Sequence, residues 1–84
     1  LYYVQSYGDY VKIHTKEKVI IASETLKNME EHLRGYCIRI HKSYLVNRKA
    51  IKYVEGNQVK IHEMMLPIGL KYRDGFFRSF NERP

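Results

Sequence analysis

Apolar and polar residues alternate along most of the chain, with a repeat of two residues. In segment 9–14, the apolar Val11 and Ile13 are separated by Lys12 and followed by His14. This repeat is typical of a β-strand that buries one of its faces. The alternation, together with runs of β-branched and aromatic residues, predicts strands over 1–4, 9–14, 18–22, 37–41, 43–47, 51–54, 58–62 and 64–68.

Three short signals indicate how these strands are connected. Gly8-Asp9 lies between the first two strands and is expected to form a turn. Gly56-Asn57 consists of two residues that tolerate positive φ, which predicts a tight hairpin. Pro67 lacks a backbone N–H, so the last strand is expected at a sheet edge or to end there.

Two segments repeat with the period of a helix instead. The first has an apolar face made of Leu26, Met29 and Leu33. Ser23 is its predicted N-cap, and Gly35 lies just beyond its expected end. The second helix is predicted over 71–80, with an apolar face of Tyr72, Phe76, Phe77 and Phe80. The expected fold class is therefore mainly β: antiparallel strands in small packed sheets, with two short helices.

Length and cysteine content narrow the class of protein. A chain of 84 residues forms one small domain. Its longest apolar run, residues 19–22, is far shorter than the roughly 20 residues of a membrane span, and no signal peptide is recognisable. The single cysteine, Cys37, excludes an internal disulfide and a finger-type zinc site. We therefore expect a cytoplasmic domain.

The charge of the chain is unevenly distributed. The formal net charge is +6, and one stretch, residues 34–53, contains no acid and carries Arg34, Arg39, Lys42, Arg48, Lys49 and Lys52. Such a stretch is either a solvated basic loop or a patch for an acidic partner, for which nucleic acid is the first candidate. The first helix is acidic on its polar face, so we do not expect it to enter a DNA groove.

Catalytic and metal chemistry find little support in the sequence. The four histidines have no metal-ligand spacing, and no glycine-rich phosphate loop or suitably paired carboxylates are present. We expect no catalytic residue, no cofactor and no metal. Eight tyrosines are many for this length. Tyr3, Tyr36 and Tyr53 are expected in or near the core, whereas four others near turns or bases could contact phosphate or stack on bases: Tyr7, Tyr10, Tyr44 and Tyr72.

Three ordered motifs resemble one known family. Residues 39–47 read Arg-Ile-His-Lys-Ser-Tyr-Leu-Val-Asn, and Ile51 follows. This resembles the signature R-x-H-[RKN]-S-[YF]-[LIV]-[VI]-N of the LytTR DNA-binding domain, the mostly β output domain of many bacterial transcription regulators. Residues 8–14 are similar to the family's G-N-Y-V-x-[IV] hairpin. Residues 66–72 are similar to its L-P-[IV]-S-R-[RK]-Y segment, although Gly69-Leu70 stands in place of Ser-Arg.

The resemblance covers residues 1–80 and lacks the family's usual first strand pair. Residues 1–84 are therefore expected to be a single domain from a longer regulator, preceded by a receiver or sensor domain. The resemblance also implies sequence-specific binding of double-stranded DNA at direct repeats, with the isolated domain monomeric away from DNA. Loops at one edge of the β-fold would reach successive major grooves.

The resemblance places the DNA contacts in three segments: Asp9 and Tyr10; Lys42 and Ser43; Gly69 and Lys71. Asp9 stands where the family commonly has Asn, which puts its sequence preference in question. Among the remaining residues of the basic stretch, Arg39, Arg48 and Lys49 are expected to contact phosphate. His41 is either a hydrogen-bonded part of the scaffold or a further phosphate contact.

Two other classes of function stay open at this point. One is an RNA- or protein-binding β module, which would use the same basic and aromatic residues. The other is a hydrolase with Cys37 as nucleophile and His41 as its base. Competition between duplex DNA, single strands and RNA separates DNA binding from RNA binding, and the reactivity of Cys37 tests the hydrolase hypothesis.

Overall fold

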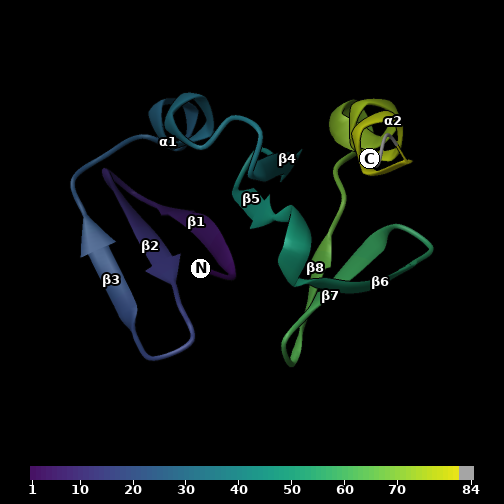
Figure 1. Cartoon of the computed structure of the whole chain (residues 1–84). Coiled ribbons are helices and arrows are strands. Elements are labelled where there is room, and N and C mark those ends of the chain that lie inside the picture. Colours follow the sequence, from purple (N-terminus) through teal and green to yellow (C-terminus); the bar gives the residue numbers. More distant parts are fainter. Residues whose placement is uncertain (82–84) are drawn as a thin grey trace.

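The computed structural model describes residues 1–81 and arranges their strands in two antiparallel sheets (Figure 1). The first sheet has the order β3-β2-β1-β5-β4 and is built from β1 (Tyr3–Tyr7), β2 (Tyr10–His14), β3 (Val19–Ala22), β4 (Cys37–His41) and β5 (Tyr44–Asn47). The second has the order β6-β7-β8 and is built from β6 (Ile51–Glu55), β7 (Gln58–Ile61) and β8 (Met64–Pro67). A short 3-10 helix, η1 (Arg48–Ala50), connects the two sheets.

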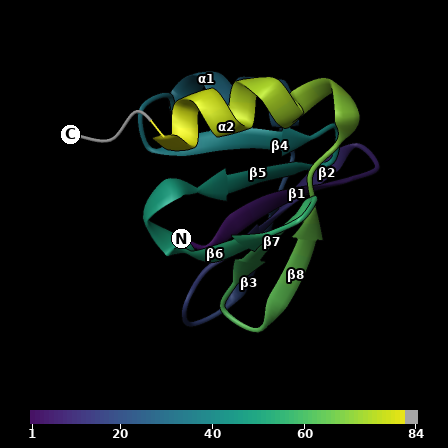
Figure 2. The ribbon, with the colours of Figure 1, turned by 90° about the vertical axis from the view of Figure 1, so that its right-hand side faces the viewer.

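Two helices pack beside the sheets, as Figure 2 shows from the side. Helix α1 (Leu26–His32) lies between β3 and β4 in the chain, and α2 (Arg73–Asn81) follows a second 3-10 helix, η2 (Leu70–Tyr72). The prediction of a mainly β fold with two short helices is confirmed. The position of Pro67 is also confirmed, because β8 is an edge strand of its sheet.

The central strands of the larger sheet are buried on both faces. Successive residues of a strand point to opposite faces, so Tyr3 and Val46 join one apolar cluster while Val4 and Leu45 join another. The first cluster fills the space between the two sheets and α2, and also contains Ile38, Ile40, Val59, Ile61, Leu66, Ile68 and Phe76. The second lies under α1 and also contains Val11 and Leu26. Two cores thus hold the larger sheet between them.

The first helix begins later than the sequence predicted. Its N-cap is Thr25 and not Ser23, because the Thr25 hydroxyl accepts a hydrogen bond from the Asn28 N–H at 3.1 Å. The Glu24 carboxylate lies before the helix and accepts from the Thr25 N–H and from the Asn28 amide, each at 2.9 Å. This later start makes Leu26 the first helical residue and places its side chain in the core under α1.

Two of the three tyrosines expected in or near the core are exposed. Tyr36 is 71% exposed and Tyr53 is 47% exposed, whereas Tyr3 is buried as predicted. Tyr36 lies in the turn between α1 and β4, and Tyr53 lies on β6, an edge strand. Alternation along the chain identifies a strand, but it does not reveal which strand faces are left uncovered.

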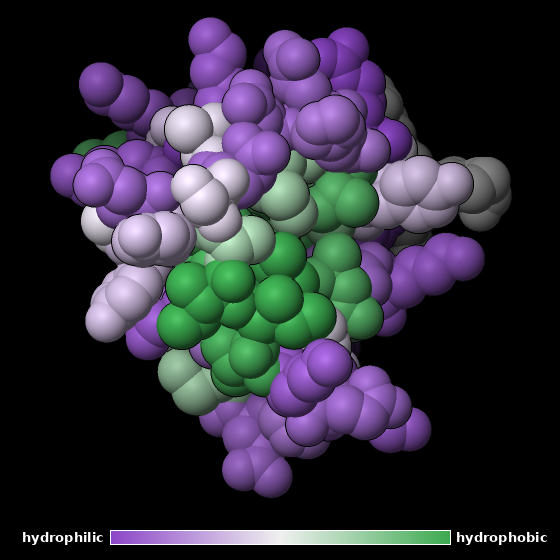
Figure 3. Space-filling view, turned by 90° about the vertical axis from the view of Figure 1, so that its left-hand side faces the viewer, coloured by the Kyte–Doolittle hydropathy of each residue, from purple (hydrophilic) through white to green (hydrophobic). Residues whose placement is uncertain are grey.

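The free edge of the larger sheet is apolar. Strand β3 is its outer strand, and Val19, Ile20 and Ile21 are all exposed there. Figure 3 shows the apolar surface that gathers on this side of the molecule.

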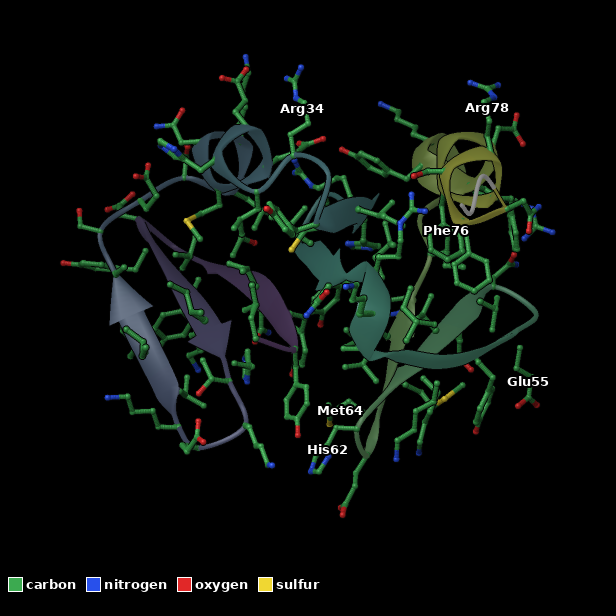
Figure 4. The ribbon with its side chains drawn as sticks, viewed as in Figure 1. Arg34, Glu55, His62, Met64, Phe76 and Arg78 are labelled. Atoms are coloured by element: carbon green, nitrogen blue, oxygen red, sulfur yellow. The ribbon has the colours of Figure 1, made fainter. Side chains whose placement is uncertain are left out.

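Phe76 anchors α2 on the sheets and is the residue whose loss we expect to be most damaging there. It is only 1% exposed, stacks on Phe80 with ring centres 5.4 Å apart, and points from α2 toward the sheets in Figure 4. We expect Phe76→Ala to lower the free energy of unfolding by about 3–5 kcal/mol, because a cavity replaces a buried ring. Urea denaturation measures this. Leu70→Ala is the control, since an 86% exposed side chain contributes little.

Candidate nucleic-acid interface

Three short segments that are far apart in the sequence lie in a row at one end of the molecule. They are the β1–β2 turn, the β4–β5 turn and the start of the segment after β8, and together residues 8–9, 42–43 and 69–71 form what we call the three-loop edge (Figure 2). The β4–β5 turn is the middle member. The Ser6 N–H donates to the Ser43 carbonyl at 3.0 Å, and the Gly69 N–H donates to the Ile40 carbonyl at 2.7 Å.

A β-bulge makes the second of these links possible. Arg39 pairs with Leu45 and His41 pairs with Tyr44, so Ile40 is an extra residue on β4. A bulged residue is left out of the regular ladder of hydrogen bonds. The carbonyl of Ile40 is therefore available to the Gly69 N–H, which attaches the segment after β8 to the β4–β5 turn.

Arg39 holds the β4–β5 turn from inside. Its Nε donates to the His41 carbonyl and its Nη2 to the Lys42 carbonyl, each at 2.8 Å. Its Nη1 donates to the Glu30 carboxylate of α1, also at 2.8 Å. The side chain is only 16% exposed, and its guanidinium carbon lies 5.4 Å from the centre of the Tyr72 ring. Arg39 thus faces the scaffold, although the sequence suggested a phosphate contact.

His41 and Gly69 shape the junction between two of the loops. The Ser43 N–H donates to Nδ1 of His41 at 3.0 Å, so the proton of the neutral ring lies on Nε2. A Cβ at position 69 would lie 3.4 Å from Cδ2 of His41 and 3.3 Å from Cδ2 of Tyr72. Glycine lets this segment approach the His41 ring closely. The geometry favours the scaffold role for His41 over a phosphate contact.

The outward-facing side chains of the edge include most of the residues that the resemblance implies. Asp9 is exposed at the β1–β2 turn, and Tyr10 is exposed beside it as the first residue of β2. Lys42 is exposed at the β4–β5 turn and Lys71 in η2, while Ser43 is half-buried. Leu70, which no motif had singled out, is 86% exposed between Gly69 and Lys71. A shallow hollow of about 380 Å³ lies between Lys42 and the 69–72 segment. The edge thus combines cations with short polar and apolar side chains.

Arg48 and Lys49 lie at the other end of β5. Strand β5 (Tyr44–Asn47) separates them from Lys42 by about 13 Å at the usual rise of a strand. Nη2 of Arg48 donates to the Ser79 hydroxyl of α2 at 2.6 Å, and Lys49 is exposed in η1. The structure therefore does not bring these two residues to the three-loop edge, and the acid-free stretch of the sequence divides between two ends of the molecule.

Sequence reasoning missed Glu30 as part of this arrangement, and it did not place Tyr72 against Arg39. The sequence places Glu30 on the acidic polar face of the first helix, and it offers Tyr72 as part of the apolar face of the second helix or as a phosphate or base contact. Both contact Arg39, one through its carboxylate and the other through its ring. No periodic signal connects Glu30 with Arg39, because they lie on different elements with a turn between them. Only the tertiary structure reveals this contact.

Nothing in residues 1–81 forms a metal centre of three or more histidine, cysteine or acidic side chains, and no helix in that range is long and apolar enough to cross a membrane. Cys37 and His41 lie at opposite ends of β4, which keeps them from acting as a nucleophile and its base. Burial raises the pKa of the Cys37 thiol to about 11. A catalytic cysteine needs the opposite shift.

The raised pKa predicts a slow thiol. At pH 8 the native protein should react with iodoacetamide about two orders of magnitude more slowly than the same chain unfolded in urea, where the thiol has its ordinary pKa. Because the thiolate is the reactive form, the native rate should rise about tenfold per pH unit and level off only above the pKa of about 11. Mass spectrometry of the alkylated chain measures both rates. Equal rates in the two states would contradict the raised pKa of the buried thiol.

The comparisons with known proteins agree with the mainly β fold. The sequence pattern of the LytTr DNA-binding domain family matches residues 1–80. A solved structure from Bacillus cereus, described as the LytTr DNA-binding domain of a methyl-accepting/DNA response regulator, superimposes with a TM-score of 0.84 at 19% identity. The match covers 98% of this chain and 81% of that one, and no curated protein matches the chain. Because the family pattern matches residues 1–80 of 84, the chain belongs to the LytTr DNA-binding domain family.

Proposed function

We propose that this domain binds double-stranded DNA sequence-specifically through the three-loop edge. The observation that carries the proposal is the row of three loops: backbone hydrogen bonds join segments from separate parts of the chain, and each segment carries exposed side chains. Membership of a DNA-binding family and a net charge of +6 support it. Residues 8–9, 42–43 and 69–71 all lie outside α1 and α2, so the contacts come from loops and not from a recognition helix.

The side chains of the edge fit the chemistry of the major groove. The Lys42 ammonium is a compact donor that can approach O6 and N7 of guanine, and the Ser43 hydroxyl can donate or accept. The Asp9 carboxylate can accept from N4 of cytosine, and Leu70 offers an apolar surface to a thymine methyl group. Lys71 is then a phosphate contact that positions the loop. We assign base reading chiefly to Lys42.

The wider role that we propose is that of the output domain of a bacterial transcription regulator. Such a regulator works in the cytoplasm, binds direct repeats and carries a receiver or sensor domain before this one. The domain itself is monomeric away from DNA and has no enzymatic activity. Selection of bound duplexes from a random pool, followed by competition with single strands and RNA, tests the proposal. Preference for RNA would favour the RNA-binding alternative.

Binding should weaken steeply with salt. Each phosphate that the protein neutralises contributes about −0.9 to the slope of log K against log salt concentration. We expect Lys71→Ala to reduce the magnitude of the slope by about one unit on every duplex, because this exposed lysine contacts the backbone. Fluorescence anisotropy over a range of salt concentrations measures the slope. A flat salt dependence of the wild type would contradict electrostatic binding, and an altered slope in Lys49→Ala would show that the far end of β5 also contacts DNA.

Lys42→Ala should reduce sequence preference. The loss should be roughly 1–3 kcal/mol on the selected site and much less on scrambled DNA, since the ammonium reads base edges. Thermal stability should hardly change, because the lysine is exposed. Lys16→Ala is the matched control: it removes the same charge from the turn at the other end of β2. Equal losses of affinity for the selected site and for scrambled DNA would show that Lys42 contacts phosphate and does not read bases.

A further inference from the structure

Arg39 is the cation of the 39–47 signature that faces inward, and it makes four contacts around the β4–β5 turn. Arg39 donates to two consecutive carbonyls, those of His41 and Lys42, and lies against the Tyr72 ring. Its remaining contact is the Glu30 carboxylate at 2.8 Å. The guanidinium is planar and its donors point in fixed directions. Holding both carbonyls therefore fixes the two peptide planes that present Lys42 and Ser43.

Glu30, which lies on α1, orients the Arg39 guanidinium through this ion pair. Helix α1 packs against β1, β4 and β5, and the Glu30 side chain is 43% exposed. An ion pair at this exposure contributes little to global stability. Its geometric effect is different, because a charge-assisted hydrogen bond selects one orientation of Arg39 among those its rotamers allow.

We propose that Glu30 is a positioning residue for DNA sequence recognition, acting through Arg39 to hold the β4–β5 turn in its reading geometry. The inference rests on the proposed function, because it assigns a role to Glu30 within that same interface. It also gives an acidic residue a favourable effect on DNA binding. General electrostatics predicts the opposite, since removing an acid from a DNA-binding protein strengthens its attraction to phosphate.

The alternative assignment makes the opposite prediction. If Arg39 contacts phosphate, then Glu30 competes with DNA for the same guanidinium. Removing Glu30 would release Arg39 and tighten binding to every duplex, including the selected site. The sign of the change on the selected site therefore distinguishes the two roles.

The experiment compares Glu30→Ala with Glu31→Ala. Both variants remove one negative charge from α1, and alanine suits a helix at either position. The Glu31 carboxylate makes no hydrogen bond or ion pair within residues 1–81, so its variant reports the charge effect alone. We expect Glu30→Ala to lower the ratio of selected-site to scrambled-DNA affinity by about tenfold, and Glu31→Ala to leave the ratio unchanged. Both should bind scrambled DNA slightly more tightly.

A second variant tests whether Glu30 acts through Arg39. Arg39→Lys keeps the charge, but one ammonium cannot reach all of the acceptors that the guanidinium contacts. It should lower the affinity ratio by a similar factor, and adding Glu30→Ala to it should produce little further loss. Equal ratios for Glu30→Ala and Glu31→Ala, or additive losses in the double variant, would overturn the proposal. Tighter binding of Glu30→Ala to the selected site would assign Arg39 to phosphate.

Amide hydrogen exchange provides a readout that needs no DNA. The Ser43 N–H is held by Nδ1 of His41 within the turn that Arg39 braces. Its exchange should accelerate several-fold in Glu30→Ala and stay unchanged in Glu31→Ala, because only the first variant loosens the turn. If the wild type showed no preference among duplexes, the proposed function would fail, whereas the exchange rates would still decide whether Glu30 positions the turn. Unchanged exchange in both variants would overturn that role.

Discussion

The pairing of β1 with β5 is the constraint on which the rest of the structure depends. It aligns Tyr3 with Val46 and Val4 with Leu45, and each of these pairs belongs to a different apolar cluster. A slip of one residue would exchange the buried faces, so burial on both sides fixes this register firmly. The same register brings the Ser6 N–H to the Ser43 carbonyl and so joins two of the three loops. The apolar core therefore determines the position of the polar edge.

The strands were predictable because alternation is a local property. The strand at 37–41 agrees with β4 at both ends, and the three motif segments identify the loops that the structure brings together. The choice between Ser23 and Thr25 as N-cap was not predictable, because both are good caps and only the packing of Leu26 separates them. The exposure of Tyr36 and Tyr53 likewise depends on which surfaces other elements cover.

The candidate site shows why a count of charges overstates an interface. Residues 34–53 carry six bases, but β4 and β5 pair as an antiparallel hairpin in the middle of this stretch. The hairpin brings Arg34 and Arg48 to one end, where the Arg48 N–H donates to the Tyr36 carbonyl, and leaves Lys42 at the other end. Arg39 precedes Lys42 by only three residues, yet it faces the scaffold while Lys42 faces solvent. The β-bulge at Ile40 contributes to this difference, since it changes the alternation of β4 just before the turn. Charge density along a sequence predicts the class of partner but not the contacting residues.

Recognition by short loops places a particular demand on this scaffold. A recognition helix carries its own backbone hydrogen bonds into the groove, whereas a turn relies on neighbouring groups to hold its peptide planes. Here the His41 ring and the Arg39 guanidinium provide that support, and Gly69 allows the neighbouring loop to pack against them. Residues of the signature thus serve geometry as well as contact. This explains how one motif can combine an inward-facing arginine and histidine with an outward-facing lysine.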